Sequence, residues 1–317
     1  NGRLGIAKKL INEAKKAGAD IIKFQTFSTE KIITSSAKKA SFQRKTKPNE
    51  TMYKMLLNLE LSFKEFKILS RISKKKNIEF LSTGFDIESL KFLHTLKQKR
   101  FKIPSGEITN YPLLKFIAGL RKKVILSTGM SNLGEIDLAL KVLTKFGTPL
   151  KDITVLHCNS SYPTPVKDAN LNAMITIRNK FGVDVGYSDH TLGIEAAIIA
   201  VSLGAKIIEK HLTLNRKFSG PDHMASIEPH VFKKMVSAIR RTEEYLGSGK
   251  KIPTRSEREN IDLVRKSIVA SRNITKGEKF SSANLTTKRP GYGTSPMRWE
   301  KVINKTSKRN YKKNDFI

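Results

Sequence analysis

The chain has 317 residues, of which 38% are hydrophobic, so it is long enough for one large domain and a small one. No apolar run reaches the roughly 18 residues of a membrane-spanning helix, so we expect no membrane-spanning segment and no membrane partner. The single cysteine, Cys158, excludes an intrachain disulfide. We therefore expect a cytoplasmic protein.

The charge admits two interpretations, because 60 Lys and Arg residues against 28 Asp and Glu residues give a net charge of +32. Phosphate neutralisation by these residues would make this a nucleic-acid-binding protein. A binding footprint gathers on one face, however, whereas basic residues occur here in every segment, as at 74–76, 121–123 and 312–313. We favour lysine-rich solvated helix faces and expect no nucleic-acid partner, although the positive field would help draw in an anionic substrate.

Short β-rich runs alternate with amphipathic helical stretches along the chain. The first helical stretch, 4–17, places Leu4, Ala7 and Ile11 on one face. Another begins at Ser62 with Glu65 three residues on, which is a capping box. The expected strands are 21–27, 79–83, 101–104, 124–127, 154–158, 183–187 and 206–212, and the other expected helices are 87–97, 112–120, 133–146, 170–181, 193–203 and 229–246.

Repeated strand–helix units favour a parallel sheet. A closed barrel of this kind needs eight strands, and the chain offers seven after an opening helix. We therefore expect an α/β fold, a (β/α)8 TIM barrel whose first strand lies upstream of Asn1. An open doubly wound sheet is the alternative, and it predicts a Gly-rich nucleotide loop early in the chain, where none occurs.

A change in composition near residue 248 predicts the domain organisation. Residues 1–247 form the barrel in this interpretation, and the Gly-, Lys- and Pro-containing stretch 248–264 is a linker. Residues 265–317 contain short strands and turns and form a small β-rich domain. A domain of about 50 residues is near the lower size limit for independent folding, so it would need support from the barrel or from a second subunit.

Polar residues close nearly every expected strand. One strand ends with Lys23 and Gln25, and three others end in hydroxyl–glycine turns at 82–84, 105–106 and 127–129. Active sites of barrels lie at these carboxyl ends. Hydroxyls and free backbone amides, with Lys23 and Lys102 supplying charge, predict a site for phosphate or carboxylate oxygens.

Two histidines close the last two expected strands, His190 after Asp189 and His211 after Glu209. Each alone could be a structural histidine, but together they predict a site for one divalent metal with open positions for chemistry. His157 is a third candidate ligand. A zinc site with Cys158 is the weakest alternative, because the chain has no second cysteine.

These residues resemble the sialic acid synthase family, which includes N-acetylneuraminate, legionaminic acid and pseudaminic acid synthases. The stretch from residue 267, with KRPG at 288–291, is similar to the antifreeze-like SAF (β-clip) domain of the same family. The matching strings, in order along the chain, are KFQTF at 23–27, FLSTGFD at 80–86, KIPSGE at 102–107, LSTGM at 126–130, HCNSSYP at 157–163, YSDHT at 187–191, EKH at 209–211 and GPDH at 220–223.

The resemblance implies condensation of phosphoenolpyruvate with open-chain N-acetylmannosamine, or a related N-acetylated amino sugar, by a domain-swapped homodimer. His190 and His211 would hold Mn²⁺, with Mg²⁺ or Co²⁺ as alternatives, and Glu209 and Lys23 would join them in catalysis. Arg289 would come from the neighbouring subunit. The substrate-binding residues that the resemblance implies are Lys23, Gln25, Thr83, Lys102, Ser105, Ser127, Ser160, Tyr162, Ser188, Asp222 and Arg289.

Two departures keep alternatives open. Only Asn1 and Gly2 match the string that ends the family's first strand, so its glutamate is not in this sequence, and residues 1–317 alone should be inactive and poorly folded. A non-catalytic remnant is therefore a further alternative to the enzyme and to the nucleic-acid-binding protein. Among substrates, Ser160 stands where relatives often carry Asn or Thr, and GPDH at 220–223 favours the N-acetylneuraminate and legionaminic side over the pseudaminic side.

Overall fold

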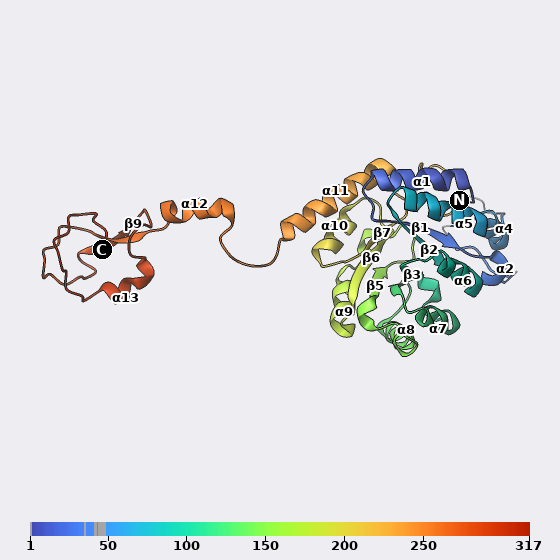
Figure 1. Cartoon of the computed structure of the whole chain (residues 1–317), viewed down its shortest axis with the longest axis horizontal. Helices are drawn as coiled ribbons and strands as arrows, with labels where there is room; N and C mark the ends of the chain where they lie inside the picture. Colours follow the sequence, from blue (N-terminus) through green and yellow to red (C-terminus); the bar gives the residue numbers. More distant parts are fainter. Residues whose placement is uncertain (1, 35, 41–42, 44–48) are drawn as a thin grey trace. The chain divides into compact units, whose positions relative to one another are not determined.

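The computed structural model describes residues 2–34, 36–40, 43 and 49–317. It divides the chain into two compact units, Asn1–Gly247 and Ser248–Ile317, which are drawn in Figure 1. Asn1, one of the two residues matched to the family's first-strand string, lies outside the described residues. No helix in the described part of the chain has the length and apolar character needed to cross a bilayer.

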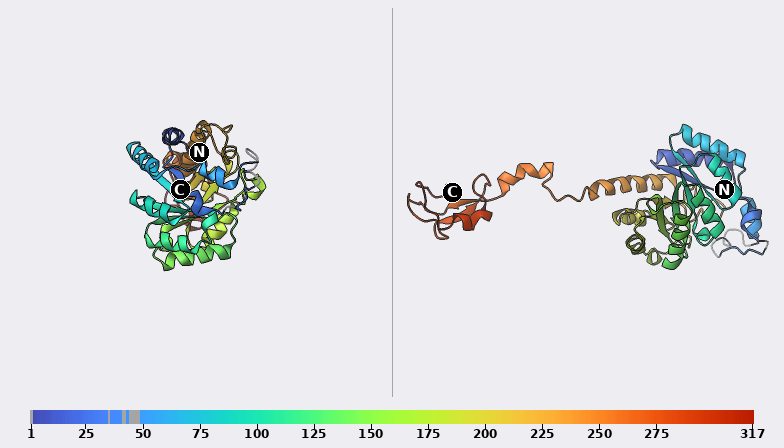
Figure 2. Two further views of the ribbon diagram at one scale, coloured as in Figure 1. Left: turned by 90° about the vertical axis from the view of Figure 1, so that its right-hand side faces the viewer. Right: turned by 60° about the horizontal axis from the view of Figure 1, so that its bottom comes forward.

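The first unit is built on parallel strands that follow one another in chain order, with helices around their outer side (Figures 1 and 2). Two of the strands form one pair, β1–β2, and five form the sheet β3-β4-β5-β6-β7. Each strand expected from the sequence is present, with its ends within 2 residues of the expectation. The strands are β1 (Ile21–Thr26), β2 (Glu79–Gly84), β3 (Arg100–Ile103), β4 (Lys123–Ser127), β5 (Ile153–Cys158), β6 (Asp184–Asp189) and β7 (Ile208–Lys210).

The helices begin at local caps and bury one apolar face. Helix α5 (Phe63–Lys75) starts at the predicted capping box of Ser62 and Glu65 and buries Phe66 and Leu69 against the sheet. Short helices between β1 and α5 were not predicted. The helices of this unit are α1 (Leu4–Lys16), α2 (Thr29–Ile32), α4 (Met52–Leu57), α5, α6 (Ile87–Thr95), α7 (Tyr111–Gly119), α8 (Leu133–Lys145), α9 (Asn172–Phe181), α10 (Glu195–Ser202) and α11 (Pro229–Leu246).

Side chains join the two sheets where the backbone ladder is interrupted between β2 and β3. The buried carboxamide of Gln98 accepts a hydrogen bond from Ser82 N at 2.5 Å and donates one to Ser82 O at 3.3 Å. At the start of the same strands, Arg100 Nε lies 2.8 Å from Glu79 Oε1. Strands β2 and β3 are therefore neighbours, and the whole arrangement is a curled parallel sheet.

The described residues do not close this sheet into a barrel. Within them, β1 is paired with β2 alone and β7 with β6 alone. The structure therefore shows the α/β class and a curled five-stranded parallel sheet, while a closed eight-stranded barrel stays a prediction.

Many of the basic residues end helices. The last turns of α1, α5 and α9 carry Lys15 and Lys16, Lys74 and Lys75, and Arg178. Cations in these turns are stabilised by the partial negative charge of a helix carboxyl end. The basic residues in these turns thus have a local structural role.

The second unit contains the antiparallel pair β8 (Ser267–Ala270) and β9 (Leu285–Lys288), with the short helix α13 (Trp299–Val302). Ile268, Ile274 and Phe280 belong to its small core. The predicted linker 248–264 differs from the structure, because it contains helix α12 (Arg255–Val264). Thr254 and Glu257 form a capping box there, a local signal that the Gly- and Pro-based interpretation overlooked.

Candidate active site

Charged side chains from three strands meet at the carboxyl end of the sheet. Lys102 of β3 is only 4% exposed, and its Nζ lies 3.3 Å from Glu209 Oε1 of β7. Lys23 of β1 approaches the other carboxylate oxygen, Oε2, at 3.7 Å. Two hydroxyls complete this centre, since Lys102 Nζ donates to Ser127 Oγ at 2.6 Å and Ser188 Oγ donates to Glu209 Oε1 at 2.9 Å.

The electrostatics of this centre follow from its burial. Burial by itself would raise the pKa of Glu209, but Lys102, Lys23 and the Ser188 hydroxyl together hold it well below the usual range. Burial lowers the pKa of Lys23, and the Glu209 carboxylate opposes that shift. The carboxylate is therefore ionised, and the side chains of Lys23 and Lys102 are held toward it, which makes a compact, preorganised set of donors.

A second group of small polar side chains lies at the ends of β3, β4 and β5. The Gly129 backbone N–H donates to Ser105 Oγ at 3.0 Å, and Cys158 Sγ lies 3.3 Å from the same oxygen. A Cβ at Gly129 would come within 2.4 Å of Ser160 Oγ and 2.9 Å of Ser105 Oγ. A larger residue would therefore displace these hydroxyls, and glycine lets the backbone approach them closely.

The two predicted histidines face each other. The His190 and His211 ring centroids are 5.4 Å apart, and the Tyr162 ring lies 4.1 Å from His190 and 5.8 Å from His211. His190 Nδ1 donates to the Asn159 carbonyl oxygen at 2.7 Å, which leaves Nε2 as the ring's acceptor nitrogen. The Asn159 carbonyl was not predicted, because a backbone acceptor leaves no signal in residue type.

Both imidazoles are neutral in this environment. Burial, reinforced by His211, lowers the pKa of His190 to about 4, and burial also lowers the pKa of His211. Neutral imidazoles have the lone pairs that a divalent metal needs, and the hydrogen bond to the Asn159 carbonyl fixes the tautomer of His190. Within the described residues no group of three or more His, Cys, Asp or Glu side chains is placed to hold a metal, so this pair would leave the remaining positions to water or substrate.

His157 and Cys158 do not join the histidine pair. His157 Nε2 donates to the Ala169 carbonyl oxygen at 2.9 Å, and its ring lies beside Tyr187. The alternation of side chains along β5 turns it away from the strand-end centre, while it turns Cys158 toward Ser105. The candidate role of His157 as a ligand is therefore not supported.

Four further residues that the resemblance implied lie in three places: two on neighbouring strands, one near the histidine pair and one in the second unit. Gln25 and Thr83 are register partners on β1 and β2, and the buried Thr83 hydroxyl has no hydrogen-bond partner in the described part of the protein. Asp222 is close enough for its charge to oppose the low pKa of His211 and to add to the effect of burial, which raises the pKa of Tyr162. Arg289 belongs to the second unit and directly follows β9.

The chain has clear similarity to known proteins. Residues 10–251 match the NeuB family, and residues 265–317 match the SAF domain. Over 318 residues the chain is 52% identical to N,N'-diacetyllegionaminic acid synthase from Campylobacter jejuni, covering 100% of this chain and 95% of that protein. Over 321 residues it is 32% identical to pseudaminic acid synthase from the same organism, covering 100% of this chain and 92% of that protein.

A solved structure supports the same grouping. The crystal structure of N-acetylneuraminic acid synthetase from Leptospira borgpetersenii in complex with citrate superposes with a TM-score of 0.72 at 38% identity. The alignment covers 82% of this chain and 86% of that one. These relatives are synthases, which supports the enzymatic interpretation over the nucleic-acid-binding alternative.

Proposed function

The chain belongs to the NeuB family of carbon–carbon bond-forming synthases, and we propose that it condenses phosphoenolpyruvate with the open-chain form of an N-acetylated amino sugar. The observation that carries this proposal is the meeting of Lys23, Lys102 and Glu209 beside the facing imidazoles of His190 and His211. Phosphoenolpyruvate, the sugar and water would give a nonulosonate and inorganic phosphate.

Phosphoenolpyruvate carries a phosphate and a carboxylate, so its site needs several cations and donors. We assign this role to Lys23, Lys102 and the hydroxyls around them, because burial strengthens their attraction for an anion. Glu209 balances the two lysines until the substrate arrives. The hydroxyls in this assignment are those of Thr83, Ser105, Ser127 and Ser188.

His190 and His211 would hold one divalent ion, Mn²⁺ in our proposal, with Mg²⁺ or Co²⁺ as alternatives. Such an ion would supply Lewis-acid polarisation of the sugar aldehyde. The chain's own residues would orient the reactants: Glu209 holds both lysine ammonium groups, and Tyr162 covers the imidazoles. Orientation matters because the enol carbon must attack the aldehyde and water must then meet the cation that results.

The sugar would lie against Gln25, Ser160, Tyr162 and Asp222, and Arg289 of a second subunit would complete its site in a domain-swapped homodimer. We propose a sugar of the legionaminic type with two acetamido groups, because identity is 52% to the diacetyllegionaminic acid synthase and 32% to the pseudaminic acid synthase. N-acetylmannosamine, the precursor of N-acetylneuraminate, is the alternative.

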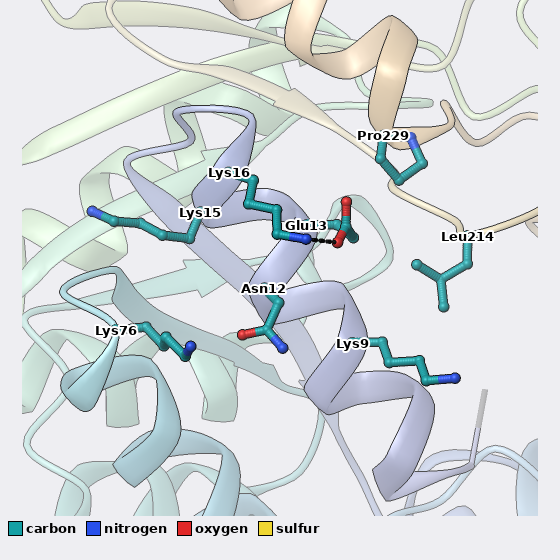
Figure 3. A pocket seen from close by; sticks show the side chains of 8 residues that line it. All are labelled: Lys9, Asn12, Glu13, Lys15, Lys16, Lys76, Leu214 and Pro229. Atoms are coloured by element: carbon teal, nitrogen blue, oxygen red, sulfur yellow. Dashed lines mark hydrogen bonds and ion pairs between the residues drawn. The ribbon is translucent and has the colours of Figure 1, made fainter.

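We also propose that the curled sheet closes into a barrel through an eighth strand between β7 and β1. A cavity of about 430 Å³ lies between α1 and the start of α11, with Lys9, Asn12 and Pro229 on its wall (Figure 3). Asn12 Oδ1 is buried there without a hydrogen-bond partner among the described residues. The proposed strand would pair the edges of β1 and β7 that have no partner strand among the described residues.

The decisive experiment offers the full-length protein phosphoenolpyruvate, Mn²⁺ and a panel of mono- and diacetamido sugars, and measures phosphate release. We expect release with the diacetamido sugar above all, and none with either His190→Ala or His211→Ala. Retained activity in both variants would contradict the metal assignment. Absence of release with every sugar would contradict the proposed reaction.

A further inference from the structure

A completely buried ion pair lies directly behind the two imidazoles. Lys210 Nζ is 2.6 Å from Asp189 Oδ2, and the two side chains are 1% and 0% exposed. Asp189 immediately precedes His190, and Lys210 immediately precedes His211. The ion pair thus joins the residues from which both imidazoles extend.

The pairing of β6 with β7 explains this placement. Ser188 is in register with Glu209, and Asp189 is in register with Lys210. Successive side chains of a strand point to opposite faces. The Ser188–Glu209 hydrogen bond and the imidazoles therefore share the face of the active site, and the ion pair crosses the same two strands on the opposite face.

Both carboxylate oxygens of Asp189 and two of the three N–H donors of Lys210 form local hydrogen bonds. Asp189 Oδ1 accepts from Thr191 N at 2.8 Å and from Thr191 Oγ1 at 2.7 Å. Lys210 Nζ also donates to the Thr191 carbonyl oxygen at 2.6 Å. The residue before His190 and the residue after it are consequently tied to the same lysine, so the backbone of His190 is held from both sides relative to β7.

We propose that Asp189 and Lys210 are positioning residues that set the relative placement of His190 and His211, so that the imidazoles form a ready-made site for a divalent metal. The inference rests on the metal role assigned above to these histidines. An apolar pair could hold two strands together equally well, because the free-energy cost of removing two charges from water offsets much of their mutual attraction. A buried ion pair does add a fixed geometry, which metal ligands require from the residues that support them.

The test compares two ion pairs that each cross neighbouring strands. Lys210→Met removes the ion pair with Asp189. Arg100→Met removes the ion pair with Glu79, which lies at the amino ends of β2 and β3, away from the candidate active site. Mn²⁺ affinity of the full-length protein is measured by isothermal titration calorimetry. We expect Lys210→Met to weaken binding by about tenfold or more. We expect Arg100→Met to leave it within twofold.

A second variant keeps the test decisive if Lys210→Met does not fold. The double variant Asp189→Asn/Lys210→Met leaves no unpaired charge and still lacks the contact from residue 210 to Thr191. We expect it to fold and to bind Mn²⁺ as weakly as Lys210→Met. Affinity within twofold of the wild type in either folded variant would overturn the proposal.

A readout without metal separates this inference from the proposed function. The imidazole signals of His190 and His211 are recorded by NMR on histidine-labelled protein, with His190→Gln and His211→Gln used for assignment among the six histidines. Loss of Lys210 should shift both signals, whereas Arg100→Met should shift neither. A wild type that binds no Mn²⁺ would contradict the metal assignment alone, and unchanged signals in the Lys210 variant would contradict the positioning role.

Discussion

An ion pair joins the side chains of neighbouring strands at two seams of the sheet, by which we mean the boundaries β6–β7 and β2–β3. The two ion pairs differ in how deeply they are buried and in which end of the strands they occupy. Asp189 and Lys210 are excluded from solvent at the carboxyl ends of their strands, beside the candidate active site. Glu79 and Arg100 stand at the amino ends, with side chains 17% and 26% exposed. Strands β6 and β7 are also joined by regular parallel backbone pairing, whereas β2 and β3 are joined by hydrogen bonds through the Gln98 carboxamide.

The difference shows that an ion pair has its largest effect where water cannot replace a missing partner. A buried charge that loses its partner keeps the full cost of desolvation, while a partly exposed charge recovers some of its hydration. We therefore expect the two seams to respond very differently to the loss of one side chain.

The largest effect on stability is expected for Lys210→Met. It leaves the Asp189 carboxylate buried without a counter-charge, and we expect a loss of about 3–5 kcal/mol in the free energy of unfolding. Urea unfolding followed by far-ultraviolet circular dichroism measures it. The double variant Asp189→Asn/Lys210→Met serves as the control and should recover part of the loss. A single variant as stable as the wild type would contradict the comparison.

Gln98→Ala should have an intermediate effect. It removes both hydrogen bonds to the Ser82 backbone and leaves a buried N–H and a buried C=O without their partner. We expect a loss of about 2–3 kcal/mol in the same unfolding measurement. A loss no larger than that of an exposed substitution would mean that the backbones of β2 and β3 associate without this side chain.

Arg100→Met should cost about 1–2 kcal/mol, because its ion pair with Glu79 has two hydrogen bonds but is partly hydrated. Added salt screens such a pair, so the difference from the wild type should shrink at high ionic strength. Urea unfolding at low and high sodium chloride concentration measures both effects. An effect as large as that of Lys210→Met would remove the distinction between the seams.

The smallest effect is expected in the second unit, at an ion pair outside any sheet seam. Hydrogen bonds from Arg272 and then Asn284 lower the pKa of Glu278 from 4.5 to about 2. A lowered pKa stabilises the fold above the ordinary value, and this stabilisation is lost as the pH falls from 4.5 toward 2. Urea unfolding of the second unit, followed by the fluorescence of Trp299, the only tryptophan, should therefore show a lower free energy of unfolding as the pH falls through this range.

Glu278→Gln is the control for this pH dependence. The carboxamide at position 278 does not titrate, so the urea concentration at the unfolding midpoint should vary less between these pH values than it does in the wild type. An equally steep dependence in the variant would assign the effect to other carboxyl groups.

Local signals predicted the elements of the fold well. The seven strands and the capping box of Ser62 and Glu65 depend on residues near one another in the chain, which is why alternation and capping rules found them. Helix α12 was missed because glycine and proline before it outweighed its own capping box. Closure of the barrel is a different kind of prediction, because it depends on a further strand that would pair with both β1 and β7 rather than on residues near one another in the chain.

The candidate site was predicted as a set of strand-end residues, but its contacts were not. Lys23, Lys102 and Glu209 come from three separate strands, and only folding brings their charges together. His157 was a candidate because it ends a strand, yet it hydrogen-bonds to Ala169 away from the pair. Residue type alone does not tell which face a strand-end side chain occupies.

The sequence by itself determined the alternation of strands and helices, their order in a parallel sheet and the polar character of the strand ends. The tertiary structure alone decided that Ser188 and Glu209 share the active-site face of the sheet with the imidazoles. It also decided that Asp189 and Lys210 form their ion pair on the opposite face. The reason is register: side chains alternate between faces with a period of two, and the face that each one occupies is set when a strand pairs with its neighbour.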